Sequence, residues 1–558
     1  MEIKQIPTLH IVYREIIFII ISFLFTTNVL YCQNNEEKLI VFHLDFNSVS
    51  LKKEYVIKWL NKASEMGYNA VLWEIEDEVK WETCPECASD DAFTKEEFKE
   101  IISYSRSLGL EPIPLLQTIG HAEYVLQHKK YYSFREDSTR YDCYCTSNDD
   151  VKNFIKKWIR EYLEVFGDVK YFHLGGDEAY AFATCSKCKA IADKYGKNKL
   201  YADYLNDIAQ PLFERGIKPG IWGDMILSHP KEINAVSNKF IIWDWNYWDG
   251  DSTPNKVMVW GEDRLTKDRI TDQTKNIFKQ IFDANNNLNP FYTSDFLIEK
   301  GYKVILCSSS RCYGDAVFAG QNNLHIDNVI GAARKAAKLN LLGTCVTSWA
   351  VRIPNYETQE VWFYLAPLTM KNPELSKENL LKETLKYLFN ISDDEIIKAF
   401  DNISYSFPFS NNNTTGIMWT GLKDSKPAPQ NYTNDLITKW KNRNQWDEIC
   451  KSISKSTTII SLGTDELNHI IPTVKTGYEI LDNWSKAAYF QYWQSVFANL
   501  IIKKENGEDN PDYNEIEKLI TNVKKEYTCW AEEWMTKKSA DLSAGLIYDV
   551  FINYFKNR

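Results

Sequence analysis

The amino-acid sequence predicts an α/β protein, a (β/α)8 TIM barrel followed by an α-helical C-terminal domain. Between residue 39 and about residue 370, short apolar segments alternate with amphipathic helical segments. Eight such units follow one another over about 330 residues, which is typical of a (β/α)8 barrel with a few long loops. Beyond residue 370 the strand pattern stops, and helical periodicity continues to the end of the chain. The predicted domains are therefore a barrel at 36–370 and a helical domain at 371–558.

The expected strands are short runs rich in apolar, β-branched and aromatic residues. They occupy residues 39–46, 70–75, 111–117, 171–176, 219–224, 240–247, 302–310 and 341–349. Many of the helical segments between them end in Gly or Asn, as helix C-termini do. A doubly wound open sheet is the alternative architecture, but the sequence has no glycine-rich phosphate loop to support it.

Residues 1–32 are expected to form an export signal. Basic residues precede the apolar run 16–25, which is too short to span a bilayer comfortably. Cleavage after Cys32 would release the protein, whereas lipidation of Cys32 would attach it to a membrane. The bulky Tyr31 disfavours lipidation, and an uncleaved anchor helix is the third alternative. In each case we expect the protein on the exported side, in the periplasm, at the cell surface or secreted.

Composition and charge narrow the class of function. The 558 residues are 44% hydrophobic and 25% charged, as in a globular protein. The formal net charge is −11 and no dense basic cluster occurs, so nucleic-acid binding is disfavoured. The 18 Trp and 32 Tyr are more than an average core needs, and flat aromatic faces suit sugar rings.

Polar side chains gather at the C-terminal ends of the predicted strands, where TIM barrels carry their reacting groups. The fourth strand ends in "HLGGDE", which places two adjacent acids, Asp177 and Glu178, at the barrel mouth. Other strand ends add acids, histidines and tryptophans: Asp45, His121, His173, Trp222, Asp224, Trp243 and Trp349. Acids transfer protons and bind hydroxyls, and indole rings stack on pyranose faces. This combination predicts chemistry on a glycoside.

The chain resembles glycoside hydrolase family 20, the β-N-acetylhexosaminidases, over roughly residues 39–370. The family signature His-x-Gly-Gly-Asp-Glu stands intact at residues 173–178. The segments "FHLDF", "EIEDE", "LLQTIGHAEYVLQH", "IWGDMILSHP", "IIWDWNY" and "TSWAVR" follow the order of the short hexosaminidase D-like branch, whose barrel lacks a preceding α+β domain. The helical C-terminal part lies outside the resemblance.

The resemblance implies substrate-assisted catalysis, in which the family departs from the usual pair of carboxyl groups across the bond. Glu178 would protonate the glycosidic oxygen and later activate water. Asp177 would accept the N–H of the substrate's 2-acetamido group, whose carbonyl attacks the anomeric carbon to give an oxazolinium ion. No cofactor takes part. The adjacent charges are also expected to raise the pKa of one acid, which keeps Glu178 protonated. A structural acid pair at a helix N-terminus is the alternative.

The same resemblance implies a set of substrate-binding residues. The tryptophans would wall the acetamido pocket and the sugar face, and the histidines would orient the acid pair. Asp45 stands where many family members use an Arg for the sugar hydroxyls. The Trp-x-Glu pattern that binds the far hydroxyls in longer members is replaced here by "WAVR", so Arg352 or Glu357 is the expected substitute. The expected set is Asp45, His121, His173, Trp222, Asp224, Trp243, Trp349 and Arg352. For the aromatic residues and the histidines, a purely structural core role is the alternative.

The expected function is that of an exo-acting, retaining β-N-acetylhexosaminidase, which removes terminal β-linked GlcNAc or GalNAc from glycans. Its partners would be glycans that end in an N-acetylhexosamine. Because the hydroxyl-binding positions depart from the family pattern, the same mechanism on a sulfated hexosamine is an alternative. A catalytically inactive sugar-binding protein on the same barrel is another, which the intact acid pair disfavours.

Cysteines cluster in three loops on the same face of the predicted barrel. Two of these loops carry CxxC pairs, Cys84 with Cys87 and Cys185 with Cys188, and the third carries a CxC. Two CxxC pairs have the spacing of a structural zinc site, so these four residues are the predicted metal ligands. In an exported protein, disulfides are the competing interpretation, and free thiols are the third.

Overall fold

The structure is a computed structural model that describes residues 37–47, 49–350, 353–411, 414–415, 430–508 and 512–556. The chain divides into a unit Met1–Lys38 and a compact unit Leu39–Arg558. The predicted export signal 1–32, with Cys32, lies outside the described residues. None of the described helices is long and apolar enough to cross a membrane.

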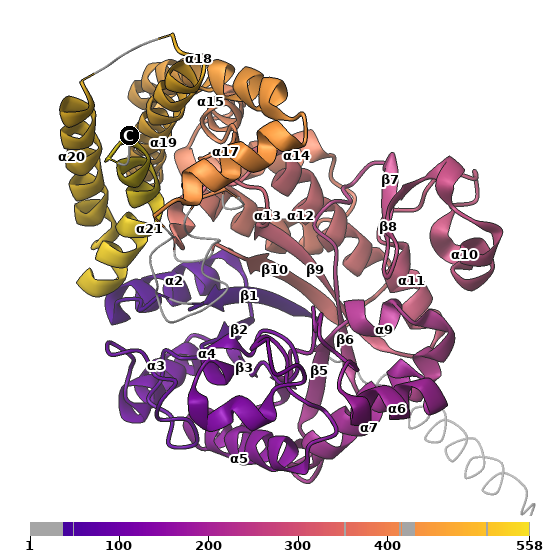
Figure 1. The fold of residues 1–558 in the computed structure, drawn as a ribbon. Helices are drawn as coiled ribbons and strands as arrows, with labels where there is room; N and C mark the ends of the chain where they lie inside the picture. Colours follow the sequence, from indigo (N-terminus) through magenta and orange to yellow (C-terminus); the bar gives the residue numbers. More distant parts are fainter. Residues whose placement is uncertain are drawn as a thin grey trace, which may run out of the picture. The chain divides into compact units, whose positions relative to one another are not determined.

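Parallel strands close into a barrel in the order β1-β10-β9-β6-β5-β4-β3-β2 (Figure 1). The strands are β1 (Leu39–Asp45), β2 (Ala70–Glu74), β3 (Glu111–Leu115), β4 (Tyr171–His173), β5 (Lys218–Trp222), β6 (Ile241–Trp245), β9 (Lys303–Arg311) and β10 (Gly343–Ser348). Each strand follows its neighbour in sequence around the barrel, and β1 pairs with both β2 and β10. The eight strands of the described barrel therefore confirm the predicted TIM architecture.

The barrel strands are almost continuously buried because helices cover their outer face and side chains fill the interior. The barrel interior is a separate apolar cluster that includes Val41, Leu72, Ile113, Ile305 and Cys345. The outward-facing residues join a larger core shared with the helices. This division explains why the sequence shows short apolar runs rather than alternating strands.

The segments between the strands contain the following α-helices: α2 (Lys53–Met66), α3 (Lys95–Ser107), α4 (Glu123–Leu126), α5 (Asp149–Phe166), α6 (Ser186–Tyr195), α7 (Lys197–Ile208), α8 (Gln210–Phe213), α9 (Asp224–Leu227), α10 (Asp272–Ile277), α11 (Tyr292–Glu299) and α12 (Asn322–Lys338). Short 3-10 helices are η1 (Lys129–Phe134), η2 (Pro230–Ala235), η3 (Lys267–Arg269), η4 (Lys279–Ile281) and η5 (Tyr356–Gln359). Local signals fix several ends. Thr94 and Glu97 form a capping box at the start of α3, and Gly67 ends α2 in a left-handed conformation.

The long segment after β6 contains an antiparallel hairpin, β7 (Lys256–Val259) and β8 (Asp263–Thr266). With α10 it extends to one side of the barrel in Figure 1. This insertion is one of the long loops expected from the spacing of the strands.

The C-terminal part is helical, as predicted. Its elements are α13 (Glu360–Lys371), α14 (Lys377–Phe389), α15 (Glu395–Ile403), α17 (Tyr432–Asn442), α18 (Trp446–Ile470), η6 (Ile471–Thr473), α19 (Tyr478–Glu505), α20 (Tyr513–Ala531) and α21 (Lys537–Lys556). Backbone hydrogen bonds join it to the loop after β1: Lys52 N–H donates to Trp534 O at 3.0 Å, and Thr536 N–H donates to Ser50 O at 2.9 Å. The helices thus pack directly on the barrel, while the domain boundary at residue 370 stays a prediction.

Candidate active site

The two adjacent acids follow β4, and glycines shape the turn that presents them. β4 ends at His173, three residues before the predicted end, because Gly175 and Gly176 adopt left-handed φ angles of +62° and +91°. A Cβ at Gly176 would lie 2.5 Å from the hydroxyl of Tyr201, which donates a hydrogen bond to the Gly176 carbonyl. Only glycine fits this turn. The chain therefore leaves the strand early and places Asp177 over the barrel mouth.

Glu178 itself has a left-handed φ of +42°, which is rare for a residue with a side chain. Its backbone N–H donates a 3.1 Å hydrogen bond to Oδ2 of Asp224, the first residue of α9. The other oxygen of Asp224, Oδ1, accepts a 3.3 Å bond from the indole N–H of Trp245 at the end of β6. Strained backbone that the surroundings hold in place is characteristic of functional sites.

His121 lies between the two acids. Its Nε2 is 3.3 Å from Oδ2 of Asp177 and 3.5 Å from Oε2 of Glu178. The loop after β3 comes so close to the acid pair that a Cβ at Gly120 would clash with the Asp177 carbonyl oxygen. His121 also has a left-handed φ, +51°. The predicted orienting role of His121 thus corresponds to direct contact with both acids.

The pKa values in this cluster depend on burial and on His121. Burial raises the pKa of Asp177, although His121 opposes the shift. Burial also raises the pKa of Glu178, but hydrogen bonds from His121 and Tyr180 outweigh it, so this pKa is lowered overall. The expectation that the neighbouring charge keeps Glu178 protonated is therefore wrong for the free protein. Burial further raises the pKa of Asp224 to about 7.

The charge of His121 completes the cluster. Although burial lowers the pKa of His121, its interactions with Asp177 and Glu178 raise it well above the usual range of histidine. His121 is therefore an imidazolium at neutral pH, and it neutralises part of the charge of the acid pair.

Three of the predicted aromatic residues form the floor and one side of the mouth. Trp222 and Trp243 are each only 1% exposed and contact the ring of His173 at centroid distances of 4.3 and 4.9 Å. Trp349 is half-buried, packs edge-on against Trp222 at 5.9 Å, and donates its indole N–H to Tyr247 Oη at 2.7 Å. Trp349 is thus the predicted tryptophan whose surface is accessible to a ligand.

His173 is buried, and its Nδ1 accepts a 2.9 Å hydrogen bond from the N–H of Gly175. Its Nε2 has no hydrogen-bond partner among the described residues. Burial lowers the pKa of His173 to about 3, so the ring is neutral. His173 therefore supports the turn before the acid pair.

Of Asp45 and Arg352, both predicted to bind the sugar hydroxyls, only Asp45 is among the described residues. Asp45 is 5% exposed, and its Oδ1 accepts a 2.7 Å hydrogen bond from the N–H of Asn47. Its carboxylate is thus used at least partly by its own loop. Arg352 lies outside the described residues.

The structure adds residues to which the sequence assigned no role. Glu74 accepts hydrogen bonds from the Gln117 amide at 3.0 Å and from His43 at 3.2 Å, at the ends of β1 to β3. Trp245 and Tyr247, half-buried and buried, contact each other at 5.1 Å, and Trp245 bonds to the same Asp224 that holds Glu178. The only sequence feature that pointed to Trp245 and Tyr247 was their position in the strand-end motif "IIWDWNY".

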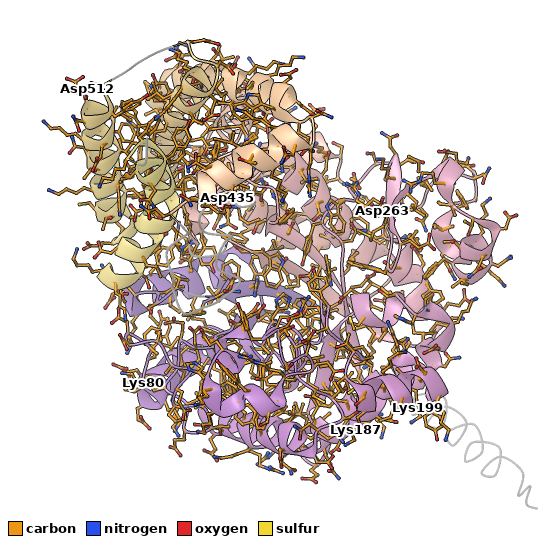
Figure 2. The ribbon with its side chains drawn as sticks, viewed as in Figure 1. Lys80, Lys187, Lys199, Asp263, Asp435 and Asp512 are labelled. Atoms are coloured by element: carbon orange, nitrogen blue, oxygen red, sulfur yellow. A yellow bond between two sulfur atoms is a disulfide. The ribbon has the colours of Figure 1, made fainter. Side chains whose placement is uncertain are left out.

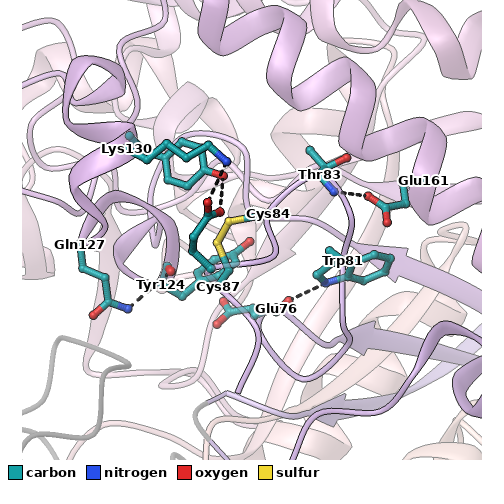
Figure 3. Close-up of a disulfide and its surroundings, with 11 residues drawn as sticks. Glu76, Trp81, Thr83, Cys84, Cys87, Tyr124, Gln127, Lys130 and Glu161 are labelled. Atoms are coloured by element: carbon teal, nitrogen blue, oxygen red, sulfur yellow. Dashed lines mark hydrogen bonds and ion pairs between the residues drawn. A yellow bond between two sulfur atoms is a disulfide. The ribbon is translucent and has the colours of Figure 1, made fainter. Parts of the chain in front are cut away.

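The predicted zinc ligands do not come together. Cys84 and Cys87 form a disulfide with each other in the loop after β2 (Figure 3). Around it, Trp81 donates its indole N–H to the Glu76 carbonyl, and Thr83 N–H bonds to Glu161. A ligand set of two CxxC pairs is therefore wrong, because one pair is consumed by its own disulfide. A different group, Glu136, Cys145, Cys185 and Cys188, has ligand atoms that all lie within 4.8 Å of one another.

Comparisons with known proteins agree with this site. Residues 59–257 match the model of "Glycosyl hydrolase family 20, catalytic domain". The chain is 27% identical over 221 residues to lacto-N-biosidase of Bifidobacterium bifidum, covering 38% of this chain and 19% of that protein. It is 26% identical over 214 residues to human hexosaminidase D, covering 36% and 44% respectively. The matched segment thus spans less than half of either relative.

Solved structures resemble the chain more loosely. A chitobiase of Flavobacterium johnsoniae aligns with a TM-score of 0.46 and 16% identity, over 93% of this chain and 78% of that one. A β-N-acetylhexosaminidase of Bacteroides fragilis aligns with a TM-score of 0.44 and 17% identity, over 60% and 66%.

Proposed function

Since residues 59–257 belong to glycosyl hydrolase family 20, we propose that this protein is an exo-acting, retaining β-N-acetylhexosaminidase. It removes terminal β-linked GlcNAc or GalNAc from glycans by substrate-assisted catalysis. The observation that carries the proposal is the unequal placement of two adjacent acids. The Asp177 side chain is 11% exposed, and its Oδ1 has no hydrogen-bond partner among the described residues, whereas the Glu178 side chain is 38% exposed.

Each acid has an environment suited to its proposed role. A buried carboxylate oxygen without a partner loses hydration that a ligand N–H restores, so Asp177 is prepared to accept the acetamido N–H. The more exposed Glu178 reaches solvent, where the leaving group and the attacking water must lie. The acetamido carbonyl then acts as the nucleophile and forms the oxazolinium intermediate, which the charge of Asp177 stabilises. In this mechanism no metal or other cofactor takes part.

Substrate binding would change the pKa values of the two acids from those of the free protein. In the free protein the pKa of Asp177 is raised and that of Glu178 is lowered. An acetamido N–H that donates to Asp177 favours its anion, and the anion raises the pKa of the neighbouring Glu178. Substrate binding thus favours the ionised form of Asp177 and the protonated form of Glu178, the acid that faces the glycosidic oxygen. His121 contacts both carboxylates.

A sulfated hexosamine is the second candidate substrate. The end of β1 carries Asp45, an acid, where many family members use an Arg for the sugar hydroxyls, and its carboxylate already accepts a bond from Asn47 N–H. Recognition at that edge of the sugar must therefore differ from the family pattern. The inactive sugar-binding alternative is disfavoured because the acid pair and its contacts to His121 are intact.

Hydrolysis of aryl β-glycosides of GlcNAc, GalNAc and 6-sulfated GlcNAc tests the proposal. Turnover of the first two, with the β-anomer as the initial product by NMR, supports a retaining hexosaminidase. Turnover of the sulfated sugar alone supports the second candidate. Glycan binding without turnover of any of the three supports the binding protein. Equal cleavage of an aryl β-glucoside, which lacks the acetamido group, contradicts the substrate-assisted mechanism.

We also propose that the protein acts outside the cytoplasm, on glycans of the periplasm, the cell surface or the medium. The Cys84–Cys87 disulfide supports this proposal, because disulfides persist in oxidising compartments. Fractionation of the source cells tests it. Recovery of the protein with membranes, lost when Cys32 is replaced by Ala, would indicate lipidation, and recovery in the cytoplasm would contradict export.

A further inference from the structure

Three thiols and one carboxylate converge beside the candidate active site. The Sγ atom of Cys145 lies 3.8 Å from the Sγ atoms of both Cys185 and Cys188. The carboxylate of Glu136 belongs to the same group, whose ligand atoms are all within 4.8 Å of one another. Only two of the four residues form a CxxC pair, since Glu136 and Cys145 come from a separate loop.

The spacing of the sulfur atoms fits a tetrahedral metal ion. Two thiolates bound to zinc at about 2.3 Å and at the tetrahedral angle lie about 3.8 Å apart. The two measured sulfur separations of 3.8 Å match this value. Thiolates together with one carboxylate oxygen form a donor set that zinc accepts.

Local structure holds each ligand in place. A short antiparallel pairing in the loop after β3 joins Glu136 N–H to the Cys143 carbonyl at 2.9 Å and Cys145 N–H to the Phe134 carbonyl at 2.8 Å. It presents Glu136 and Cys145 together. On the other side, Cys185 is the N-cap of α6, and its Sγ accepts a 3.3 Å hydrogen bond from the N–H of Cys188. The N-terminus of this ten-residue helix stabilises thiolates.

The group carries an unsatisfied polar atom that calls for a ligand. Glu136 is 4% exposed, and its Oε1 accepts a 3.0 Å bond from Cys185 N–H. Its Oε2 is buried and has no hydrogen-bond partner among the described residues. A buried carboxylate oxygen of this kind is costly unless a cation binds it. Disulfide formation would not satisfy it, and it would leave one of the three thiols unpaired.

We propose that Glu136, Cys145, Cys185 and Cys188 bind a structural zinc ion. The site is closed, because four protein ligands leave no position for a reactive water molecule. Three thiolates and one carboxylate give the bound site a net charge of −2. The amino group of Lys187 lies on the same helix turn, where it donates to the Ser147 carbonyl at 2.5 Å, and the Ser147 hydroxyl lies 3.0 Å from Cys188 Sγ. Lys187 is a residue of α6, and Figure 2 labels it near the lower edge of the molecule.

The zinc ion would join the two loops that supply the candidate catalytic residues. Cys145 and Glu136 belong to the loop after β3, which also carries His121. Cys185 and Cys188 follow the acid pair in the segment after β4. The contact of His121 with Asp177 and Glu178 crosses the same boundary. The metal therefore fixes the distance between the two loops from outside the sugar-binding region.

Metal analysis of the purified protein tests the site. Protein prepared without added metal is expected to hold about one zinc ion per chain. Cys145→Ser and Cys188→Ser are expected to hold near none. Cys84→Ser with Cys87→Ser should retain the zinc, because this pair forms its own disulfide. Cys529→Ser, an exposed thiol on α20, is the matched control and should retain it as well. Zinc that depends on Cys84 and Cys87 would overturn the ligand assignment.

Two measurements on the unaltered protein protect the test against variants that fail to fold. Replacement of zinc by Co²⁺ should give intense visible absorption and thiolate-to-cobalt charge-transfer bands, as tetrahedral thiolate sites do. Peptide mapping without reduction should find Cys145, Cys185 and Cys188 free of disulfides. A Cys145 disulfide to either partner, or protein without zinc and without cobalt bands, would overturn the proposal. Neither result bears on the hexosaminidase activity, so the two proposals fail separately.

Discussion

The side chain of Asp224 holds the backbone of Glu178: Oδ2 of the aspartate accepts a 3.1 Å hydrogen bond from the glutamate N–H. The bond joins the start of α9, which follows β5, to the loop after β4. It acts on a residue with a φ of +42°, a conformation that costs a non-glycine residue about 1–3 kcal/mol. Asp224 therefore positions the proposed general acid through its backbone and leaves the Glu178 carboxyl free for the substrate.

Asp224→Ala is expected to lower kcat by about 10–100-fold above pH 7, where Asp224 is ionised, because a hydrogen bond to a charged acceptor contributes about 1.5–3 kcal/mol. KM for an aryl β-GlcNAc glycoside should change little, since Asp224 is 5% exposed. Asp224→Asn keeps one acceptor oxygen for Glu178 N–H, but it cannot accept from Trp245 at the same time. Its kcat should fall between those of the wild type and the alanine variant. Asp203→Ala, at an exposed position on α7, is the control. If this control loses as much kcat and thermal stability as Asp224→Ala does, the positioning role of Asp224 is contradicted.

The two acids are expected to respond differently to the leaving group. Glu178→Gln removes the proton donor, so hydrolysis of natural glycans should fall by about 100-fold or more. A nitrophenyl leaving group needs less protonation and should recover part of the first step. Asp177→Asn should slow both kinds of substrate, because the orientation of the acetamido group is lost in either case. Single-turnover kinetics on both substrates measure the difference.

A thiazoline analogue of the oxazolinium intermediate provides a second measurement on the same acids. It should inhibit the wild type strongly and Asp177→Asn weakly, because the asparagine amide does not carry the stabilising charge. In the leaving-group experiment, a nitrophenyl substrate that restores the rate of Asp177→Asn would show that the roles of Asp177 and Glu178 are exchanged.

The sequence was sufficient for the fold because each barrel strand is a separate apolar run. Seven of the eight strands end within about two residues of the prediction, as with β1 at Asp45 and β10 at Ser348. β4 was the exception, since its last predicted residues are glycines whose positive φ angles break the ladder. Turn geometry of this kind depends on close contacts such as that of Gly176 with Tyr201, which no local pattern reveals.

The candidate site was only partly predictable. Asp177, Glu178, His121 and Asp224 lie together because parallel strands bring their C-terminal ends to one mouth. The lowered pKa of Glu178 could not be foreseen, because it depends on His121, which is 57 positions away in the sequence. Glu136 was equally hidden: it is one of 76 acidic residues, and only the folded loop after β3 places it beside three thiols.

The charge of His121 predicts a pH effect. Burial raises the pKa of Asp177, whereas His121 lowers the pKa of both Asp177 and Glu178. In His121→Gln this lowering influence is lost, so both carboxyl groups lose their protons at higher pH. Catalysis requires ionised Asp177 and protonated Glu178, which set the acidic and the alkaline limbs of the profile. We therefore expect the whole profile of kcat/KM to move to higher pH.

The exposed His469→Gln on α18 is the matched control, and its profile should coincide with that of the wild type. If kcat/KM of His121→Gln falls at every pH while the two limbs of its pH profile do not move, His121 acts by positioning the acids and not by its charge. Movement to lower pH would contradict the assigned influence of the imidazolium.

Glu78, in the loop after β2, predicts that the protein becomes less stable as the pH rises. It is 2% exposed, accepts a 3.0 Å hydrogen bond from Ser89, and lies beside Asp77. Burial, assisted by the charge of Asp77, raises its pKa to about 8. The unfolded carboxyl group ionises near pH 4.5, so the folded protein binds the extra proton between these two values. The stabilisation is complete below pH 4.5 and is lost as the pH rises toward 8.

Glu78→Gln is neutral at every pH and should therefore lose less stability than the wild type between about pH 5 and pH 9. Each pKa unit corresponds to about 1.4 kcal/mol. The difference in the free energy of unfolding between the variant and the wild type should therefore change in favour of the variant by a few kcal/mol at most over this pH range. Urea titrations at several pH values measure the two curves. Glu96→Gln, an exposed position on α3, should run parallel to the wild type. If Glu78→Gln also runs parallel, the buried carboxyl group does not hold its proton in the folded state.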